Sequence, residues 1–299
     1  MQYIGQLAAL GTALCWGAGA NLFAAAGARF GPQALNRLRI AFALVFLATA
    51  LLVTRGVPWP TWATPFQIGV LGLSGLVGFA FGDGFGFVSI LNLGPGRATL
   101  VASLGPLFTV AFAWPLLGER PGPLLLLGMA LLLGGLTWVL LERVHETHEE
   151  ARGLAAIGIF AGVMGAIGQA GGYVLSKIAL KTGIDPLSAT LIRVTAATIA
   201  LWGWALVRGQ AVPTLAAARG DRVGTAFAAG GAFLGPFLGV TLSLFALTKI
   251  EAGTASAITA FFPIVAILIA MRFHQEKVTP RLILGALVAI TGVIVLFLH

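Results

Sequence analysis

The residue most able to take part in binding or proton transfer is Asp83, a lone carboxylate within a long apolar stretch. It lies in the run F-A-F-G-D-G-F-G-F at residues 79–87. If this stretch crosses a lipid bilayer, a charged group at that depth costs at least about 2.5 kcal/mol and must face a cavity or a partner. Two interpretations follow. In the first, Asp83 faces a cavity and binds the ammonium group of a substrate or a proton. In the second, Asp83 lies near a helix end and its carboxylate reaches interfacial water.

Polar and aromatic side chains at comparable depth are further candidates. Asn21 and Gln169 are amides, which need hydrogen-bond partners away from water, so they either join neighbouring helices or contact a ligand. Trp16 precedes Asn21 by little more than one helical turn, and its ring suits either a packed core or a cavity wall. The residues that we expect to line a ligand cavity are Trp16, Asn21, Phe79, Asp83, Ser103, Gln169, Tyr173, Ser243, Thr259 and Phe262.

Two prolines, Pro106 and Pro263, stand in the middle of apolar segments. There each proline removes one backbone hydrogen bond and kinks its helix. A kink frees carbonyl groups toward a cavity and provides a bending point for gating. Because the two prolines occupy equivalent places in two similar segments, we interpret them as gating residues.

Four other charged residues border or enter apolar segments. Glu119 and Glu276 each stand just before the next apolar segment, where a carboxylate meets the positive N-terminus of a helix. We therefore expect a structural role for both. Arg39 and Arg193 start or lie within an apolar segment of their own, and we expect them to bind a lipid phosphate or a facing carboxylate.

One strongly charged connection, at residues 142–152, contains His145 and His148 among several glutamates. That set has the side chains of a divalent-metal site, but a solvated loop explains it without a metal, and we expect none. The chain has no Gly-x-Ser-x-Gly elbow, no P-loop and no His-Glu-x-x-His motif. The chain thus lacks the motifs that an intramembrane hydrolase or an ATP-driven pump requires, so we expect neither an enzyme nor a cofactor.

The composition is that of a protein dissolved in lipid. Of the 299 residues, 58% are hydrophobic and only 9% are charged, whereas soluble domains carry about a quarter charged residues. The net charge of +8 comes from 18 Lys and Arg residues scattered singly at the ends of apolar runs, where they meet lipid head groups. We therefore expect contact with a lipid bilayer and no binding of nucleic acid.

Ten apolar segments are long enough to cross a bilayer, which takes about 20 residues per helix. The chain is thus predicted to be an all-α integral membrane protein. The predicted spans are residues 4–26, 33–53, 66–90, 95–117, 123–141, 153–178, 186–207, 225–247, 253–271 and 281–298.

The sequence also resembles itself after a shift of about 157 positions, without a gap. This predicts two five-helix repeats, residues 1–142 and 153–299, joined by the acidic loop 143–152. Because five is odd, the second repeat must enter the membrane from the opposite side, as in many secondary transporters. The shift places Gly78, Gly82, Gly96, Ala98, Pro106, Glu119, Leu125, Gly128 and Gly135 on Gly235, Gly239, Gly253, Ala255, Pro263, Glu276, Leu282, Gly285 and Gly292.

The repeated segments resemble a known family. Residues 94–106 read G-P-G-R-A-T-L-V-A-S-L-G-P and continue to Glu119, and residues 251–263 read E-A-G-T-A-S-A-I-T-A-F-F-P and continue to Glu276. These segments resemble the fourth and ninth helices of the EamA branch of the drug/metabolite transporter superfamily. The aromatic-rich third helix and the chain length are most similar to the YddG-type bacterial amino-acid exporters.

This resemblance implies a function and a location. We expect a secondary transporter of the bacterial inner membrane that exports small metabolites, above all aromatic and neutral amino acids, by alternating access around a midplane cavity. The alternatives are a drug or nucleotide-sugar carrier of the same fold, or a non-transporting membrane assembly factor. The expected partners are a small-molecule substrate and the lipid bilayer, with the chain working as a monomer.

The orientation in the membrane is a point of conflict. With the N-terminus in the cytoplasm, most Lys and Arg residues fall outside, against the positive-inside tendency. The family resemblance implies instead that both termini are cytoplasmic, and we take that as the expectation.

Overall fold

The computed structural model describes residues 3–144, 152–274 and 280–298, and every regular element within these ranges is helical. His145, His148, Glu276 and most of the predicted acidic loop therefore lie outside the described residues. The elements of the first half are α1 (Ile4–Phe30), α2 (Pro32–Arg55), α3 (Pro65–Gly75), the π-helix η1 (Leu76–Gly82), α4 (Asp83–Ala102), α5 (Gly105–Leu117) and α6 (Pro123–Val144).

The second half repeats this order, adds the short helix α9, and has two helices, α11 and α12, where the first half has α4. Its elements are α7 (Arg152–Leu180), α8 (Pro186–Val207), α9 (Ala211–Gly220), α10 (Arg222–Ala232), the π-helix η2 (Phe233–Gly239), α11 (Val240–Leu247), α12 (Ala252–Thr259), α13 (Phe262–His274) and α14 (Pro280–Phe297). The helix α9 falls where the sequence predicted only a connection.

The predicted membrane spans are present. Nine helical stretches in the described residues have the length and apolar composition of a membrane span, and a shorter apolar stretch, Ile283–Phe297, is the tenth predicted span. The third span runs continuously through α3, η1 and the first part of α4 to Gly94. The chain is thus an all-α membrane protein of the predicted class.

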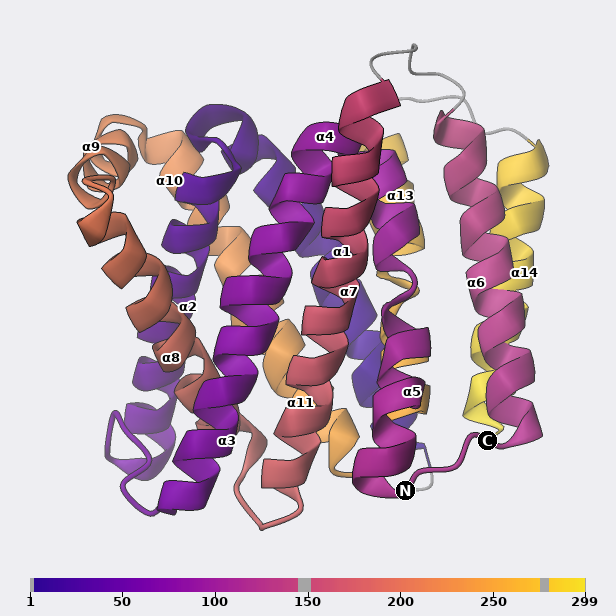
Figure 1. Cartoon of the computed structure of the whole chain (residues 1–299), viewed down its shortest axis with the longest axis horizontal. Helices are drawn as coiled ribbons and strands as arrows, with labels where there is room; N and C mark the ends of the chain where they lie inside the picture. The colour runs from indigo at the N-terminus through magenta and orange to yellow at the C-terminus, as the bar shows by residue number, and fades with distance from the viewer. Residues whose placement is uncertain (1–2, 145–151, 275–279, 299) are drawn as a thin grey trace.

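The two halves enter the bundle from opposite sides. Both chain ends lie at one edge of the molecule, whereas α6 ends and α7 begins at the opposite edge (Figure 1). The rings of Tyr3 and Phe297, near the two ends, lie with their centroids 6.3 Å apart. An odd number of spans in each half produces this inversion.

The π-helical segments mark equivalent places in the two halves. The starts of η1 and η2, at Leu76 and Phe233, are 157 positions apart, the same offset that relates α5 to α13 and α6 to α14. A π-helical turn holds an extra residue and shifts the faces that the following residues present. Both third spans, which end in α4 and α11, carry this shift just before the residue at position 83 or 240.

Each first helix packs against the π-helix of the other half. A Cβ atom on Gly82 in η1 would lie 3.0 Å from the backbone nitrogen of Gln169 in α7. A Cβ atom on Gly172 in α7 would lie 2.9 Å from the Cα atom of Gly78. On the other side of the bundle, α1 packs against η2, and the ring of Trp16 approaches Gly239. Only glycine permits such close contact between backbones.

Two turns are built in the same way. Gly31, between α1 and α2, has φ 75° and ψ 161°, and Gly94, between the third and fourth spans, has φ 76° and ψ 162°. A positive φ favours glycine, and the extended ψ suits a residue that precedes proline. Pro32 and Pro95 follow these glycines, so a Gly-Pro pair reverses the chain at both places.

The two mid-span prolines differ from the prediction in one respect. The helix is interrupted before each of them: α4 ends at Ala102 and α5 begins at Gly105, while α12 ends at Thr259 and α13 begins at Phe262. Pro106 and Pro263 therefore stand in the first turn of a new helix, where the missing N–H leaves no helical bond unmade. The fourth span of each half therefore consists of two half-helices, whereas the sequence predicted one continuous helix with a kink.

The last spans of the two halves, α6 and α14, also meet through glycines. A Cβ atom on Gly135 would lie 2.5 Å from the backbone nitrogen of Ala289 and 2.5 Å from the carbonyl oxygen of Gly285. A Cβ atom on Gly292 would lie 2.8 Å from the carbonyl oxygen of Gly128. The pairs Gly128–Gly285 and Gly135–Gly292 are equivalent in the repeat, so this crossing lies at the symmetry element between the halves.

We predict that Gly135→Ala destabilises the protein by about 1–3 kcal/mol, because the added methyl group forces the two backbones apart. Gly134→Ala is the matched control, since a Cβ atom on Gly134 would meet nothing within 4 Å. The measurement is the melting temperature of each purified variant in detergent. Equal melting temperatures for the two variants would contradict the close crossing.

Candidate functional site

A cavity of about 300 Å³ lies between the two halves of the bundle. Eight of the ten residues predicted to line a ligand cavity are in its wall, together with Pro106. From the first half the wall takes Trp16, Phe79, Asp83, Ala102, Gly105, Pro106 and Thr109, and from the second half it takes Gln169, Ala170, Tyr173, Arg193, Val240, Ser243, Ser256, Thr259, Ala260 and Phe262. We call this space the central cavity.

Three predicted site residues are not in this wall. The side-chain nitrogen of Asn21 donates to the carbonyl oxygens of Gly17, at 3.1 Å, and Ala266, at 3.2 Å, so Asn21 joins α1 to α13. Ser103 donates to the carbonyl oxygen of Leu100 at 2.6 Å in the turn before α5. Pro263 is buried in the first turn of α13. Asn21 and Ser103 thus donate to nearby carbonyl groups in this structure, and ligand contact by either residue stays a prediction.

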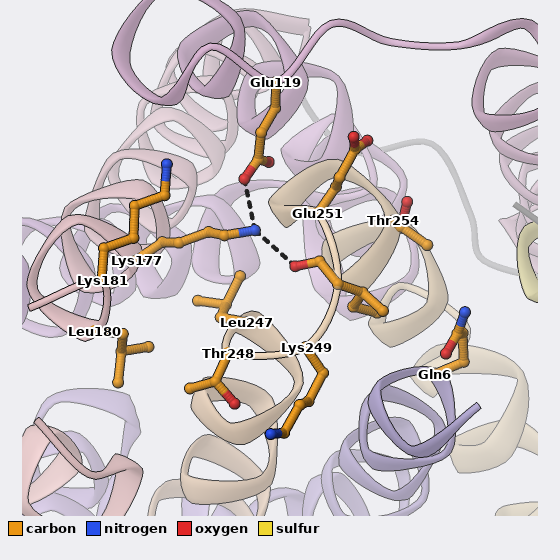
Figure 2. Close-up of a pocket in the computed structure, with 11 residues that line it drawn as sticks. Gln6, Glu119, Lys177, Leu180, Lys181, Leu247, Thr248, Lys249, Glu251 and Thr254 are labelled. Carbon is orange, nitrogen blue, oxygen red and sulfur yellow. Dashed lines mark hydrogen bonds and ion pairs between the residues drawn. The ribbon is translucent and has the colours of Figure 1, made fainter. Parts of the chain in front are cut away.

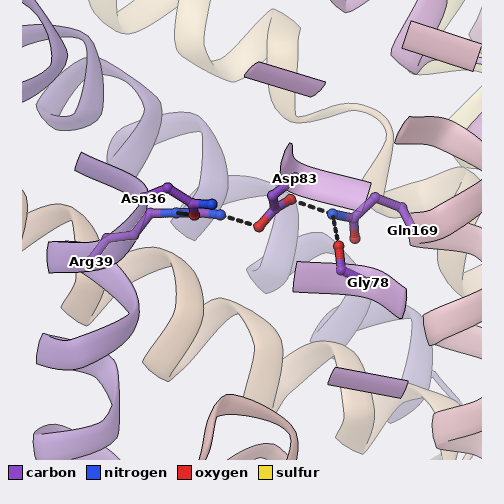
Figure 3. A network of polar contacts seen from close by, with 5 residues as sticks. All are labelled: Asn36, Arg39, Gly78, Asp83 and Gln169. Atoms are coloured by element: carbon purple, nitrogen blue, oxygen red, sulfur yellow. Dashed lines mark hydrogen bonds and ion pairs between the residues drawn. The ribbon is translucent and has the colours of Figure 1, made fainter. Parts of the chain in front are cut away.

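Asp83 has protein partners on both of its oxygens (Figure 3). One oxygen accepts a hydrogen bond from Arg39 in α2, and the other accepts one from the amide of Gln169 in α7. Gln169 also donates to the carbonyl oxygen of Gly78 at 3.1 Å. Asp83 thus links two helices of its own half to the first helix of the other half, and it lies in the cavity wall.

Arg39 is held firmly in this network. Its Nε atom donates to the side-chain oxygen of Asn36 at 2.9 Å, and its guanidinium carbon lies 5.5 Å from the ring centroids of Phe23 and Phe87. The side chains of Arg39 and Asp83 are only 5% and 16% exposed. The expectation that Arg39 faces a carboxylate is confirmed, and the partner is the carboxylate that the sequence had singled out as a ligand contact.

Arg193 in α8 is the second buried guanidinium group of the site. It is 3% exposed, and its guanidinium carbon lies 4.8 Å from the centroid of the Phe79 ring. Its Nε atom has no hydrogen-bond partner within the described part of the chain. The sequence pointed to Arg193 through its match with Arg39, but assigned it to anchoring. The structure places it in the cavity wall instead.

The remaining polar wall comes mainly from the second half. Ser243 Oγ donates to the hydroxyl oxygen of Tyr173 at 2.9 Å, which joins α11 to α7. Thr109 in α5 donates to Ser256 in α12 at 3.2 Å, and this bond joins the two halves. The sequence gave no reason to choose Thr109 or Ser256 among the many hydroxyl residues of the spans. Thr259 Oγ1 is buried without a hydrogen-bond partner in the described residues.

A second cavity of about 530 Å³ lies near the edge of the bundle that carries the chain ends. Glu119, from the connection between α5 and α6, pairs with Lys177 of α7 at 2.5 Å, and Lys177 donates to the carbonyl oxygen of Ile250 at 2.6 Å (Figure 2). Lys181 donates to the carbonyl oxygen of Leu117 at 3.2 Å. These contacts tie the first half to the second at this edge.

Glu119 caps a helix N-terminus, as predicted, but the helix is α12 and not the next helix in sequence. One of its oxygens accepts a hydrogen bond from the backbone nitrogen of Ala252 at 2.7 Å, at the N-terminus of α12. The sequence placed it at the N-terminus of the next helix, α6. A carboxylate stabilises a helix N-terminus in either case, but here the helix belongs to the opposite half.

Comparison with protein families fits this architecture. The model of the EamA-like transporter family matches the chain twice, over residues 3–141 and 156–298. The chain belongs to the EamA-like transporter family. Members of this family are membrane transporters of small molecules and not enzymes, so the central cavity of this family member lies in a transporter scaffold.

A solved crystal structure is similar to this chain over nearly its whole length. It superposes with a TM-score of 0.70 at 21% sequence identity and covers 99% of this chain and 96% of that chain. At this identity the likeness shows the fold alone. No curated protein matches the sequence.

We predict that breaking the buried pair destabilises the protein. Asp83→Asn leaves the Arg39 charge buried and unpaired, and Arg39→Gln leaves the Asp83 charge in the same condition, so each variant should lose about 3–5 kcal/mol. The double variant removes both charges and should regain a large part of that loss. Melting temperatures of the four proteins in detergent measure the effect. Losses that simply add in the double variant would show that the two side chains do not interact.

Proposed function

We propose that this EamA-family protein is a secondary transporter that exports aromatic and neutral amino acids by alternating access around the central cavity. The observation that carries the proposal is the position of that cavity, which is walled by both inverted halves. In inverted-repeat transporters the substrate lies between the repeats, and rocking of one repeat against the other exposes it to each side in turn.

The size and lining of the central cavity support a small amphipathic substrate. Its volume of about 300 Å³ is at the lower end of the range for small-molecule sites. Trp16, Phe79 and Phe262 supply aromatic surface, while Gln169 and Ser243 supply polar groups. Apolar walls with a few placed polar groups are typical of sites that bind a side chain and orient a charged head group.

The contacts of Glu119 support alternating access. Glu119 belongs to the first half, and its partners Lys177 and Ala252 belong to the second. When the halves rock apart at this edge, the ion pair and the helix cap must break, and water in the second cavity can hydrate the charges. The proposed transport cycle therefore includes the opening of this contact.

We further propose that the edge with the chain ends faces the cytoplasm of a bacterial cell. Lys177, Lys181 and Lys249 line the second cavity at this edge, which agrees with the positive-inside tendency even though the whole-chain distribution does not. Impermeant cysteine labelling of Thr61→Cys, in the connection between α2 and α3, in intact cells tests this orientation. We expect no labelling until the cells are opened if that connection is cytoplasmic.

The experiment that tests the function is efflux of radiolabelled phenylalanine and leucine from proteoliposomes. Ala260→Trp fills the central cavity, so we predict that it slows efflux about tenfold or more. Leu287→Trp is the control, because Leu287 is 54% exposed on α14 and lies outside the cavity wall. Equal rates for wild type, both variants and empty liposomes would refute amino-acid transport.

We predict that Pro106→Ala and Pro263→Ala slow transport severalfold without a large loss of stability. Alanine supplies a backbone N–H, which lets the two half-helices join into one continuous helix and removes the bending point. Efflux rates are measured together with melting temperatures. Unchanged rates in both variants would mean that the interruptions have only a structural role.

A further inference from the structure

We infer that Arg193 binds a carboxylate group of the transported molecule, so that the substrates are small carboxylates with an apolar or aromatic body. This inference rests on the proposed transport function and names the group that the cavity recognises. It differs from the interpretation in which Asp83 binds a substrate ammonium group, because it assigns recognition to the positive charge of the cavity.

The repeat itself explains why Arg193 has no ion pair within the described part of the chain. Arg39 is the eighth residue of α2, and Arg193 is the eighth residue of α8. Asp83 is the first residue after η1, and Val240 is the first residue after η2. The two halves therefore carry equivalent arginines, but the position of the third span that holds a carboxylate in the first half holds a valine in the second. The guanidinium group of Arg193 lies beside Phe79 of the first half.

The charges of the central cavity consequently do not balance. Among the described residues, Asp83 and Arg193 are the charged residues in its wall. Asp83 forms its ion pair with Arg39 and also attracts Arg193 electrostatically, so two guanidinium groups share one carboxylate. Arg193 has no ion pair in the described ranges, and its Nε atom is an unsatisfied donor. Because a buried charge is costly without a partner, an anionic ligand is the group that completes this site.

The surroundings of Arg193 favour a carboxylate. The ring of Phe79 lies 4.8 Å from the guanidinium carbon, and a guanidinium group beside an aromatic ring can still donate hydrogen bonds from its edge, where Nε is unsatisfied among the described residues. Guanidinium N–H groups match the two oxygens of a carboxylate in a bidentate arrangement. Thr259 Oγ1, also without a partner in the described residues, lies in the same wall and offers a further hydroxyl donor.

The single free cation also limits the charge of the ligand. A nucleoside diphosphate carries at least two negative charges and would need further cations in this wall, where Arg193 is the only one among the described residues. The volume of about 300 Å³ likewise fits a molecule of amino-acid size. A monocarboxylate with an aromatic or aliphatic body satisfies both limits.

Three probes of nearly equal shape distinguish the two modes of recognition in the wild-type protein. L-Phenylalanine carries both a carboxylate and an ammonium group, 3-phenylpropionate carries only the carboxylate, and L-phenylalaninamide carries only the ammonium group. The measurement is the increase in melting temperature of the detergent-purified protein as each probe is titrated. We expect phenylalanine and 3-phenylpropionate to bind at least about tenfold more tightly than the amide.

Variants of Arg193 assign the effect to this residue. Arg193→Gln should weaken 3-phenylpropionate binding about tenfold or more, and Arg193→Lys should retain part of it as a point charge without the bidentate geometry. Arg208→Gln is the matched control, since Arg208 follows the same helix α8 but is exposed beside Trp204. If Arg193→Gln does not fold, the probe series on the wild type still decides the question.

The outcomes separate the inference from the proposed function. Loss of 3-phenylpropionate binding in Arg193→Gln without phenylalanine efflux by the wild type keeps the carboxylate site and refutes amino-acid export. Efflux of phenylalanine and its amide at equal rates keeps transport and overturns the carboxylate site. Equal binding of all three probes, or binding of none, overturns the inference as well.

Discussion

The close approach of glycine backbones between the two halves is the contact on which the rest of the structure depends. Each first helix, α1 or α7, lies against the π-helical part of the third span in the other half. Between α7 and η1 the backbones leave no room for a Cβ atom, and between α1 and η2 the ring of Trp16 lies against the glycines. In lipid, where the hydrophobic effect does not drive helices together, such backbone packing is a main source of association. It also determines where Trp16 and Gln169, on those first helices, meet the central cavity.

The backbone of the repeat is symmetric, whereas its chemistry is not. Equivalent arginines enter the bundle from α2 and α8, but only Arg39 has a carboxylate in the described structure. The paired half supplies a rigid, neutral support in which Asp83 and Gln169 hold three helices together. The other half supplies a positive charge that has no ion pair of its own among the described residues and lies beside aromatic walls. The two repeats thus share a backbone, but only the second presents a charged group to a ligand. This asymmetry suits a substrate that is itself polar at one end.

The sequence predicted the number and length of the spans, the two halves and most of the cavity wall, because apolar length and an ungapped repeat are properties of the chain alone. It did not predict which way Asn21 and Ser103 turn, because that depends on helix crossings and on the turn before α5. It assigned Glu119 to the nearest helix in sequence, whereas inversion brings the N-terminus of α12 closer in space. The extra residue in each π-helix, which sets the direction of Asp83, has no signature in composition or periodicity.

The valine at position 240 has a consequence for Arg193. The two halves repeat the same order of spans, but Asp83 and Val240 differ at equivalent positions, where Val240 belongs to the buried apolar core. With valine at position 240, Asp83 is the only carboxylate in the cavity wall among the described residues, and the Nε atom of Arg193 is left to an external molecule. One difference between the two halves of the inverted repeat therefore separates an internally paired arginine from one that is available for recognition.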